Sequence, residues 1–325
     1  MKPLLTLVIL ILTVLTGGCS SRDFASVKYS SSVISTVNIK DMTVTFIDVN
    51  KGKKIADWKV DKPYNGGIFL PDGDTLLLYG KSLKEVDLFS LKKGKKIQSW
   101  NTGKGFVDAL LIDGKKGIVF SNDSNNSLDF YTYKGKKEKS ITLSASPFTL
   151  LQSKDGSKLF TISFHGSMLH IINLQQGEYI KSVPIHSAAA GAILNEEKNE
   201  IWIGGHGEGS IMEKTIHVYK IDSGELTRQI NAPEMPVNFS YFSHHFFVLS
   251  HGSSMLYKFN GNGKRLGSLR IGANPFEVET VGDMLVVAGY DSDDVYLVDP
   301  EGLEIYKRIK VGKGPFQIIK GENMP

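Results

Sequence analysis

The sequence has a single cysteine, and this scarcity excludes several kinds of site. One Cys cannot form an intrachain disulfide, a zinc site built on cysteines or a Cys-x-x-Cys redox centre. An excess of one charge is also missing: 38 Lys and Arg against 34 Asp and Glu leave a net charge of +4 over 325 residues. So small a surplus gives no reason to expect a nucleic acid as partner.

Long apolar runs and helical periodicity are scarce as well. The one long apolar run, Leu4 to Leu15, has about a dozen residues, too few to cross a hydrocarbon core of about 30 Å but suited to a signal peptide. After it, apolar residues recur at every second position, which predicts strands and no amphipathic helix. With 41% hydrophobic and 22% charged residues, the chain has the composition of an ordered globular protein.

The residues after the apolar run, Thr16-Gly17-Gly18-Cys19, resemble the lipobox of bacterial lipoproteins, although Thr16 stands where that motif usually has Leu. The resemblance implies a signal peptide over residues 1–18 and a lipid-modified Cys19 that becomes the new N-terminus. We then expect a Ser-rich lipidated tether over 19–32, and a membrane-anchored protein on the extracytoplasmic side of the cell membrane. Two acyl chains suffice for stable anchoring. The alternative is ordinary secretion with an incidental Cys.

A turn centred on glycine recurs at intervals of 39 to 47 residues, after one strand-like run and before another. These seven positions are Gly52, Gly94, Gly135, Gly177, Gly224, Gly263 and Gly302. Each unit also contains an inner strand and a second turn. In three copies this turn has the sequence Asp-Gly: Asp72-Gly73, Asp113-Gly114 and Asp155-Gly156. Four strands per repeat predict the blade of a β-propeller.

The two chain ends each supply part of a blade. Pro315 to Ile319 reads as an innermost strand without partners, whereas Val33 to Ile39 and the two strands after it lack an innermost strand. We therefore expect an all-β fold over residues 33–325: a seven-bladed β-propeller of four-stranded antiparallel blades, with a closure blade shared by the N- and C-terminal strands. Pairing the ends in this way leaves no free sheet edge between them.

These motifs resemble the YVTN-type seven-bladed β-propeller family of the lactonase and quinoprotein-like superfamily. Leu70-Pro71-Asp72-Gly73, and Phe46-Ile47-Asp48 with Gly52-Lys53, match its repeat well, whereas the namesake strand is degenerate. The likeness covers nearly all of residues 33–320. It is specific for fold and poor for function, because this superfamily includes enzymes, ligand binders and interaction scaffolds.

The repeat assigns loops to faces. Numbering strands outward from the channel, the loops from fourth to first strand and from second to third strand emerge on the top face, and the others on the bottom. The top loops carry the residues that we take as a candidate ligand or metal cluster: His165, His186, His206, His251, Glu208 and Glu234. Imidazoles and carboxylates could hold a divalent metal or serve as general acid and base. The alternative is that His-Gly is only a turn signal.

The bottom loops of the first three blades are rich in lysine. We take Lys53, Lys54, Lys95, Lys96, Lys136 and Lys137 as candidate contacts to anionic lipid or wall polymer. Solvated, solubilising turns are the alternative.

The leading prediction for function is a binding or interaction scaffold whose top face is presented to a protein, peptide or glycan ligand. The second is a metal-assisted hydrolase or lyase acting on a lactone or cyclic ester, for which the resemblance offers no matching channel site. A third, binding of a quinone cofactor, lacks the Trp-docking repeat of quinoprotein propellers. The sequence therefore implies no specific cofactor, a divalent metal being possible, and no assigned catalytic residue.

Overall fold

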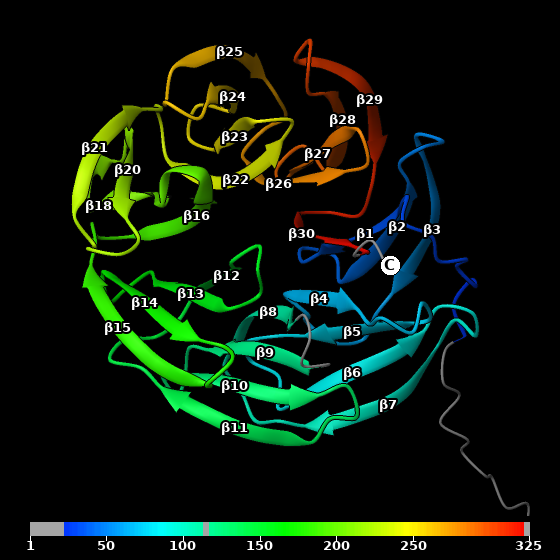
Figure 1. The fold of residues 1–325 in the computed structure, drawn as a ribbon. Helices are drawn as coiled ribbons and strands as arrows, with labels where there is room; N and C mark the ends of the chain where they lie inside the picture. Colours follow the sequence, from blue (N-terminus) through cyan, green and yellow to red (C-terminus); the bar gives the residue numbers. More distant parts are fainter. Residues whose placement is uncertain (1–22, 113–116, 322–325) are drawn as a thin grey trace, which may run out of the picture.

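A computed structural model describes residues 23–112 and 117–321, which form a ring of seven four-stranded antiparallel sheets (Figure 1). The predicted seven-bladed propeller is confirmed. Cys19, the turn Asp113-Gly114 and two bottom lysines, Lys115 and Lys116, lie outside the described residues.

Each blade is described by its strands in order from the channel outward. Blade 1 has β4 (Gly66–Phe69), β5 (Thr75–Tyr79), β6 (Glu85–Ser90) and β7 (Lys95–Asn101). Blade 2 has β8 (Phe106–Ile112), β9 (Gly117–Asn122), β10 (Ser127–Thr132) and β11 (Lys137–Thr142). Blade 3 has β12 (Thr149–Gln152), β13 (Lys158–Ser163), β14 (Met168–Asn173) and β15 (Glu178–Pro184).

Blade 4 has β16 (Ala189–Asn195), β17 (Glu200–Gly205), β20 (Thr215–Lys220) and β21 (Leu226–Asn231), with the small hairpin β18 (Gly207–Glu208) and β19 (Ile211–Met212) inserted on its top. Blade 5 has β22 (Pro236–Phe242), β23 (His245–Ser250), β24 (Met255–Asn260) and β25 (Arg265–Arg270). Blade 6 has β26 (Pro275–Val281), β27 (Met284–Gly289), β28 (Asp294–Asp299) and β29 (Glu304–Lys310). The closure blade has β30 (Pro315–Lys320), β1 (Val33–Asn38), β2 (Thr43–Asp48) and β3 (Lys53–Lys59).

The core lies between neighbouring blades. Middle strands such as β5 are buried on both faces, whereas the outermost strands expose most of their residues. Phe247 and Leu249 of blade 5, for example, pack with Val278, Leu285 and Val287 of blade 6. Because each middle strand is covered on both sides, its sequence reads as a short apolar run rather than as an alternation.

The repeated glycine turn joins the third and fourth strands on the bottom face. Six of the seven predicted glycines have positive φ, between 58° and 84°, a region that costs glycine little. In blade 6 the left-handed residue is Leu303 (φ 52°) and not the predicted Gly302. The turn is therefore displaced by one residue in that blade.

The closure blade pairs the two ends of the described chain, which Figure 1 shows as the red β30 beside the blue β1. In register, Val37 lies opposite Gln317 and Ser35 opposite Ile319. Both Ile318 and Ile319 are buried. The predicted closure is confirmed.

The segment before β1 is packed on the propeller and has no regular secondary structure. The Phe24 ring stacks on Trp58 at a centroid distance of 5.0 Å, and the Val27 side chain is buried. The Phe24 and Val27 N–H groups donate to the carbonyls of Gly94 and Leu91, in the bottom turn of blade 1. From Phe24 onward, the predicted tether thus lies against the closure blade and blade 1.

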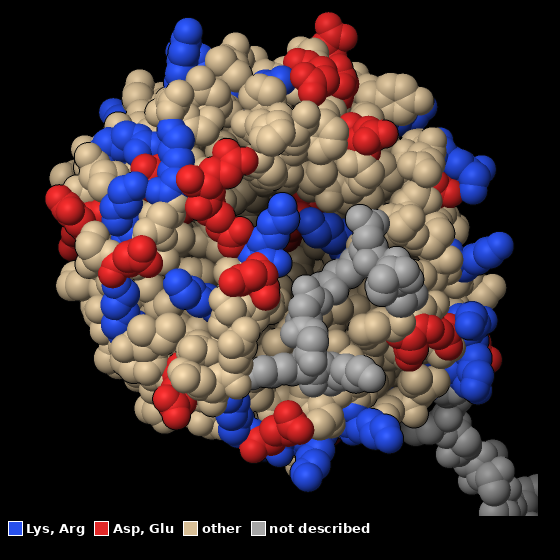
Figure 2. Space-filling view, viewed as in Figure 1, with Lys and Arg blue, Asp and Glu red and all other residues tan. Residues whose placement is uncertain are grey.

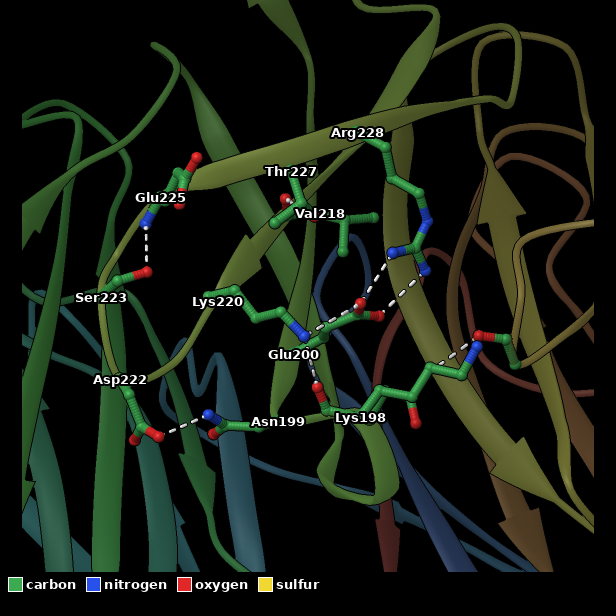
Figure 3. A network of polar contacts seen from close by, with 12 residues as sticks. Lys198, Asn199, Glu200, Val218, Lys220, Asp222, Ser223, Glu225, Thr227 and Arg228 are labelled. Atoms are coloured by element: carbon green, nitrogen blue, oxygen red, sulfur yellow. Dashed lines mark hydrogen bonds and ion pairs between the residues drawn. The ribbon is translucent and has the colours of Figure 1, made fainter.

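A buried carboxylate in blade 4 shows how the middle strands tolerate charge (Figure 3). Arg228 donates two hydrogen bonds to Glu200, at 2.7 and 2.9 Å, and Lys220 donates to the Lys198 carbonyl at 2.8 Å. Burial opposes ionisation of Glu200, but the hydrogen bonds and charge of Arg228 outweigh it and lower the pKa of this carboxyl. The ion pair with Arg228 thus compensates the buried negative charge of Glu200.

Helical structure is almost absent from the described residues: the one short element is the 3₁₀ turn η1 (Glu196–Lys198). Within residues 23–112 and 117–321, no helix has the length and apolar character needed to cross a membrane.

Candidate functional site: the top mouth of the channel

The seven innermost strands line the central channel, and polar side chains near the beginnings of five of them link one blade to the next. Asp108 of β8 accepts a hydrogen bond from the Leu150 N–H (2.8 Å), and Asn238 of β22 accepts one from Val278 (3.0 Å). Three further junctions have the same kind of link: Thr149 donates to the Ala190 carbonyl, Glu277 accepts from the Ile318 N–H, and Gln317 accepts from the Gly67 N–H.

Local backbone geometry aims these side chains. The pairing register shifts immediately before Asp108, Asn238 and Glu277, so a β-bulge precedes each of them. A bulge bends its strand and turns the following side chain toward a new direction. The polar residues therefore point along the ring at the upper part of the channel.

Blade 4 has Gly191 at the corresponding position, so no side chain is available there to form a link to blade 5. A Cβ on Gly191 would overlap the Val237 carbonyl of blade 5. The absence of a side chain thus allows β16 and β22 to approach closely, whereas the five junctions described above use a polar link.

A cavity of about 290 Å³ occupies this level of the channel. Three carboxylates line it: Asp108, Glu277 and Glu279, the last paired with Lys320 at 2.5 Å. Burial raises the pKa of Asp108 to about 7, even though the Leu150 and Ala109 N–H groups favour its ionised form. Burial and the charge of Glu279 raise the pKa of Glu277 well above its usual range. The described lining has no Lys or Arg.

Above the cavity, aromatic rings follow one another along the top face. We call Phe148, Phe164, His206, His251, Phe276 and Phe316 the aromatic arc. Its successive ring centroids lie 5.6, 5.4, 4.8, 6.1 and 4.6 Å apart. The arc runs from blade 3 through blades 4, 5 and 6 to the closure blade. Three of its phenylalanines and His206 also line the cavity. The site is thus an acidic hollow with a partly aromatic rim.

The raised pKa of Asp108 predicts a pH dependence of stability. Between about pH 4 and pH 7 this carboxyl is protonated in the folded chain but ionised in the unfolded chain, so unfolding releases a proton and stability falls as the pH rises. Over this pH interval, we expect the free energy of unfolding of Asp108→Asn to decrease by about 2–4 kcal/mol less than that of the unmodified chain. Urea unfolding of both proteins across that interval measures it; equal slopes for the two proteins would contradict the assigned ionisation.

The predicted cluster of six top-face residues does not form one group. His206 and His251 meet edge to face, and His165 is separated from His206 by Phe164. His186 instead stacks on His217 at 4.0 Å. Glu208 accepts a hydrogen bond from the Ser187 hydroxyl at 3.0 Å.

The last member, Glu234, lies beside the loop of residues 251–254, where its N–H donates to the Ser253 hydroxyl at 3.3 Å. Among the described residues, the one set of three close metal-ligating side chains is His186, Glu213 and His217. The sequence analysis had identified His186 alone of these three.

The six bottom lysines are exposed, but their charge is partly compensated. Lys54, Lys96 and Lys137 form ion pairs with Asp57, Asp87 and Asp129, at 2.6, 3.7 and 3.0 Å. Figure 2, which looks along the ring axis onto the bottom face, shows acidic side chains among the basic ones around the rim. Lys53, Lys95 and Lys136 remain exposed at the starts of, or next to, the outermost strands of three neighbouring blades.

No protein-family model and no curated protein matches this sequence. Solved structures do match in fold. Hydrazine synthase from Kuenenia stuttgartiensis has a TM-score of 0.73 at 14% identity, over 89% of this chain and 99% of that one. The dihydro-heme d1 dehydrogenase NirN, in complex with DHE, has a TM-score of 0.66 at 14% identity, over 93% and 77%.

Apo AztD from Citrobacter koseri has a TM-score of 0.58 at 13% identity, over 88% of this chain and 96% of that one. At such low identity these likenesses carry the fold and not the chemistry. By its own strand order and by these neighbours, the chain has the seven-bladed β-propeller fold.

Proposed function

We propose that this protein is a lipid-anchored, extracytoplasmic binding propeller that receives an amine-bearing peptide at the top mouth of its channel. The observation that carries the proposal is the acidic cavity beneath the aromatic arc. Carboxylates supply acceptors and negative charge, and aromatic faces attract cations. A cavity of about 290 Å³ has room for one side chain or chain end rather than for a folded partner.

The buried carboxylates also favour a cation over a neutral ligand. Asp108 and Glu277 resist ionisation because burial and neighbouring negative charge disfavour their charged forms. An ammonium group in the cavity would offset both effects and let them ionise. Binding would then release protons, so affinity should increase as the pH rises toward and past 7.

The position of the N-terminal segment supports the proposed orientation. Phe24 and Val27 are fixed against the bottom turn of blade 1, and the expected lipid attachment at Cys19 is only four residues before Asp23. Four residues reach at most about 14 Å. A lipid on Cys19 would hold the bottom face, with its exposed lysines, near the membrane and direct the aromatic arc outward.

Phenethylammonium chloride serves as the probe of the cavity, with its neutral N-acetyl derivative as the matched compound. By calorimetry we expect the amine to bind at least about tenfold more tightly than the amide, and Asp108→Asn and Glu277→Gln each to weaken it about tenfold. Glu197→Gln, which removes an exposed carboxylate on the opposite face, is the control and should change nothing. Equal affinity for amine and amide, or tight binding of a neutral oligosaccharide instead, would overturn the proposal.

The anchor has its own test. We expect Cys19→Ser to move the protein from the membrane fraction to the soluble fraction, because the acyl chains contribute most of the membrane affinity. Flotation of this variant with liposomes then measures the contribution of the lysines alone. Its binding should need anionic lipid and decline with added salt. A variant that stays in the membrane fraction regardless of lipid charge and salt would contradict the anchor.

A further inference from the structure

Two imidazoles and one carboxylate converge on the top of blade 4, outside the channel cavity. His186 lies in the loop after β15, Glu213 follows the inserted hairpin β18–β19, and His217 is the third residue of β20. One ligand atom from each lies within 4.8 Å of the others. Donor atoms around a tetrahedral zinc ion with bonds of about 2.0–2.1 Å lie roughly 3.4 Å apart. Small side-chain rotations would therefore close this group onto one ion.

His186 is the member whose present surroundings are incomplete. Both of its ring nitrogens are buried, and neither makes a hydrogen bond of good geometry, although the Gly204 backbone approaches the ring. Its ring stacks on His217 with an interplanar angle of 15°. A neutral imidazole keeps a lone pair on one ring nitrogen, and this lone pair is what a metal ion takes. An unpaired buried nitrogen is costly, and coordination to a metal would satisfy it.

Glu213 is held in place as an ionised ligand. One of its carboxylate oxygens, Oε1, accepts from the Lys214 N–H, the Thr215 N–H and the Thr215 hydroxyl, at 2.9, 2.9 and 2.6 Å. Three donors on this one oxygen favour the ionised carboxylate. The other oxygen, Oε2, faces His217 Nε2 at 3.1 Å. That oxygen is the one available to an ion.

His217 is oriented by a neighbour on the far side of its ring. The Gln229 amide nitrogen, Nε2, lies 3.3 Å from His217 Nδ1. Reversal of this amide, which exchanges its nitrogen and oxygen, would let the oxygen accept the Nδ1 proton. The lone pair of Nε2 would then be free to coordinate. Such an outer partner is the usual way in which proteins fix the tautomer and orientation of a ligating histidine.

We infer that His186, Glu213 and His217 form a binding site for a divalent transition-metal ion, and that Zn²⁺ suits this donor set best. Two imidazole nitrogens and one carboxylate oxygen make three protein ligands, which leaves a fourth position for water or for a donor atom of a bound molecule. The site is separate from the acidic cavity, because none of its three residues lines that cavity. It does not depend on the proposed peptide ligand.

The test uses the full-length chain, freed of metal by chelation and then titrated with Co²⁺ and Zn²⁺. We expect one ion per chain, visible absorption typical of four-coordinate Co²⁺, displacement of Co²⁺ by Zn²⁺, and a higher Tm with Zn²⁺. Glu213→Gln and His186→Ala should each weaken binding more than about 100-fold. His186 lies in a loop, so its variant should keep the Tm of the metal-free protein.

The matched control is His165→Gln, which removes an exposed top-face imidazole outside both the cluster and the aromatic arc and should leave metal binding unchanged. Failure to bind one ion per chain would overturn the inference. Equal binding by His186→Ala and the unmodified chain would do the same, since the ion would then be held elsewhere.

Discussion

A chain that ends at Gly314 is expected to show no cooperative unfolding transition. The deletion removes β30, which is the innermost strand of the closure blade and the partner of β1. It also removes two buried isoleucines, Ile318 and Ile319, each contributing about 2 kcal/mol by burial. Links from Gln317 to Gly67 and from Ile318 to Glu277 are lost as well.

The expected loss is of the order of 10 kcal/mol, since ladder hydrogen bonds and the exposed edge of β1 add to the burial term. That is comparable with the whole stability of a typical domain. The matched control is a chain that ends at Gly321, which keeps β30 intact and should unfold as the full chain does. Thermal unfolding followed by circular dichroism measures both. A cooperative transition within a few degrees of the full chain for the shorter deletion product would disprove closure through β30.

Gly191→Ala is expected to lower the free energy of unfolding by about 3 kcal/mol, the upper part of the usual range for overpacking. The added Cβ would overlap the Val237 carbonyl, and backbone at the centre of a closed ring cannot move aside without shifting blade 5. Elsewhere in a strand the same change would stabilise slightly, because alanine loses less conformational entropy than glycine on folding.

Gly261→Ala is the control for this prediction, since a Cβ there would meet no atom closer than 3.8 Å. Urea unfolding of the two variants should separate them by at least about 2 kcal/mol. If both changed stability equally, the close approach of β16 and β22 would not be a source of strain, and the account of the blade 4 to blade 5 junction would be wrong.

The sequence predicted the fold because the relevant signals are local and repeated. Turn glycines recur at one position of each unit. The unpaired inner strand at Pro315 to Ile319 supplies the inner strand that the blade beginning near Val33 lacks. Both features follow from short-range chemistry: positive φ at a turn and two-residue periodicity in a strand. The displaced turn at Leu303 shows the limit of this approach, because tertiary packing selected a neighbouring residue for the left-handed conformation.

The channel site was missed although a signal for it existed. Thr149, Glu277 and Gln317 each follow a Pro-Phe pair in the sequence. Glu277 and Gln317 also follow a shift in the pairing register. The direction of these side chains along the ring can be recognised only when all inner strands are aligned in space. Closure then brings Asp108 and Glu277 to one cavity, although they are far apart in the sequence.

The His186 cluster also had a partial signal. The interval from Gly177 to Gly224 is 47 residues, longer than the other intervals, and the surplus corresponds to the hairpin β18–β19 that precedes Glu213. Spacing alone could not show that this insertion returns the chain toward His186. The stacking of His186 on His217 depends on the packing of a top loop against a strand of the next blade.

The ionisation of Asp108 tests the central claim, an acidic receptor for a cation at the channel mouth, most directly. Carbon-13 NMR of the side-chain carboxyls, with the Asp108 signal assigned from Asp108→Asn, gives its pKa with and without phenethylammonium. The account predicts a pKa of about 7 in the free protein and a value at least one unit lower in the presence of the amine. A pKa near the ordinary value of about 4 in both conditions would contradict it.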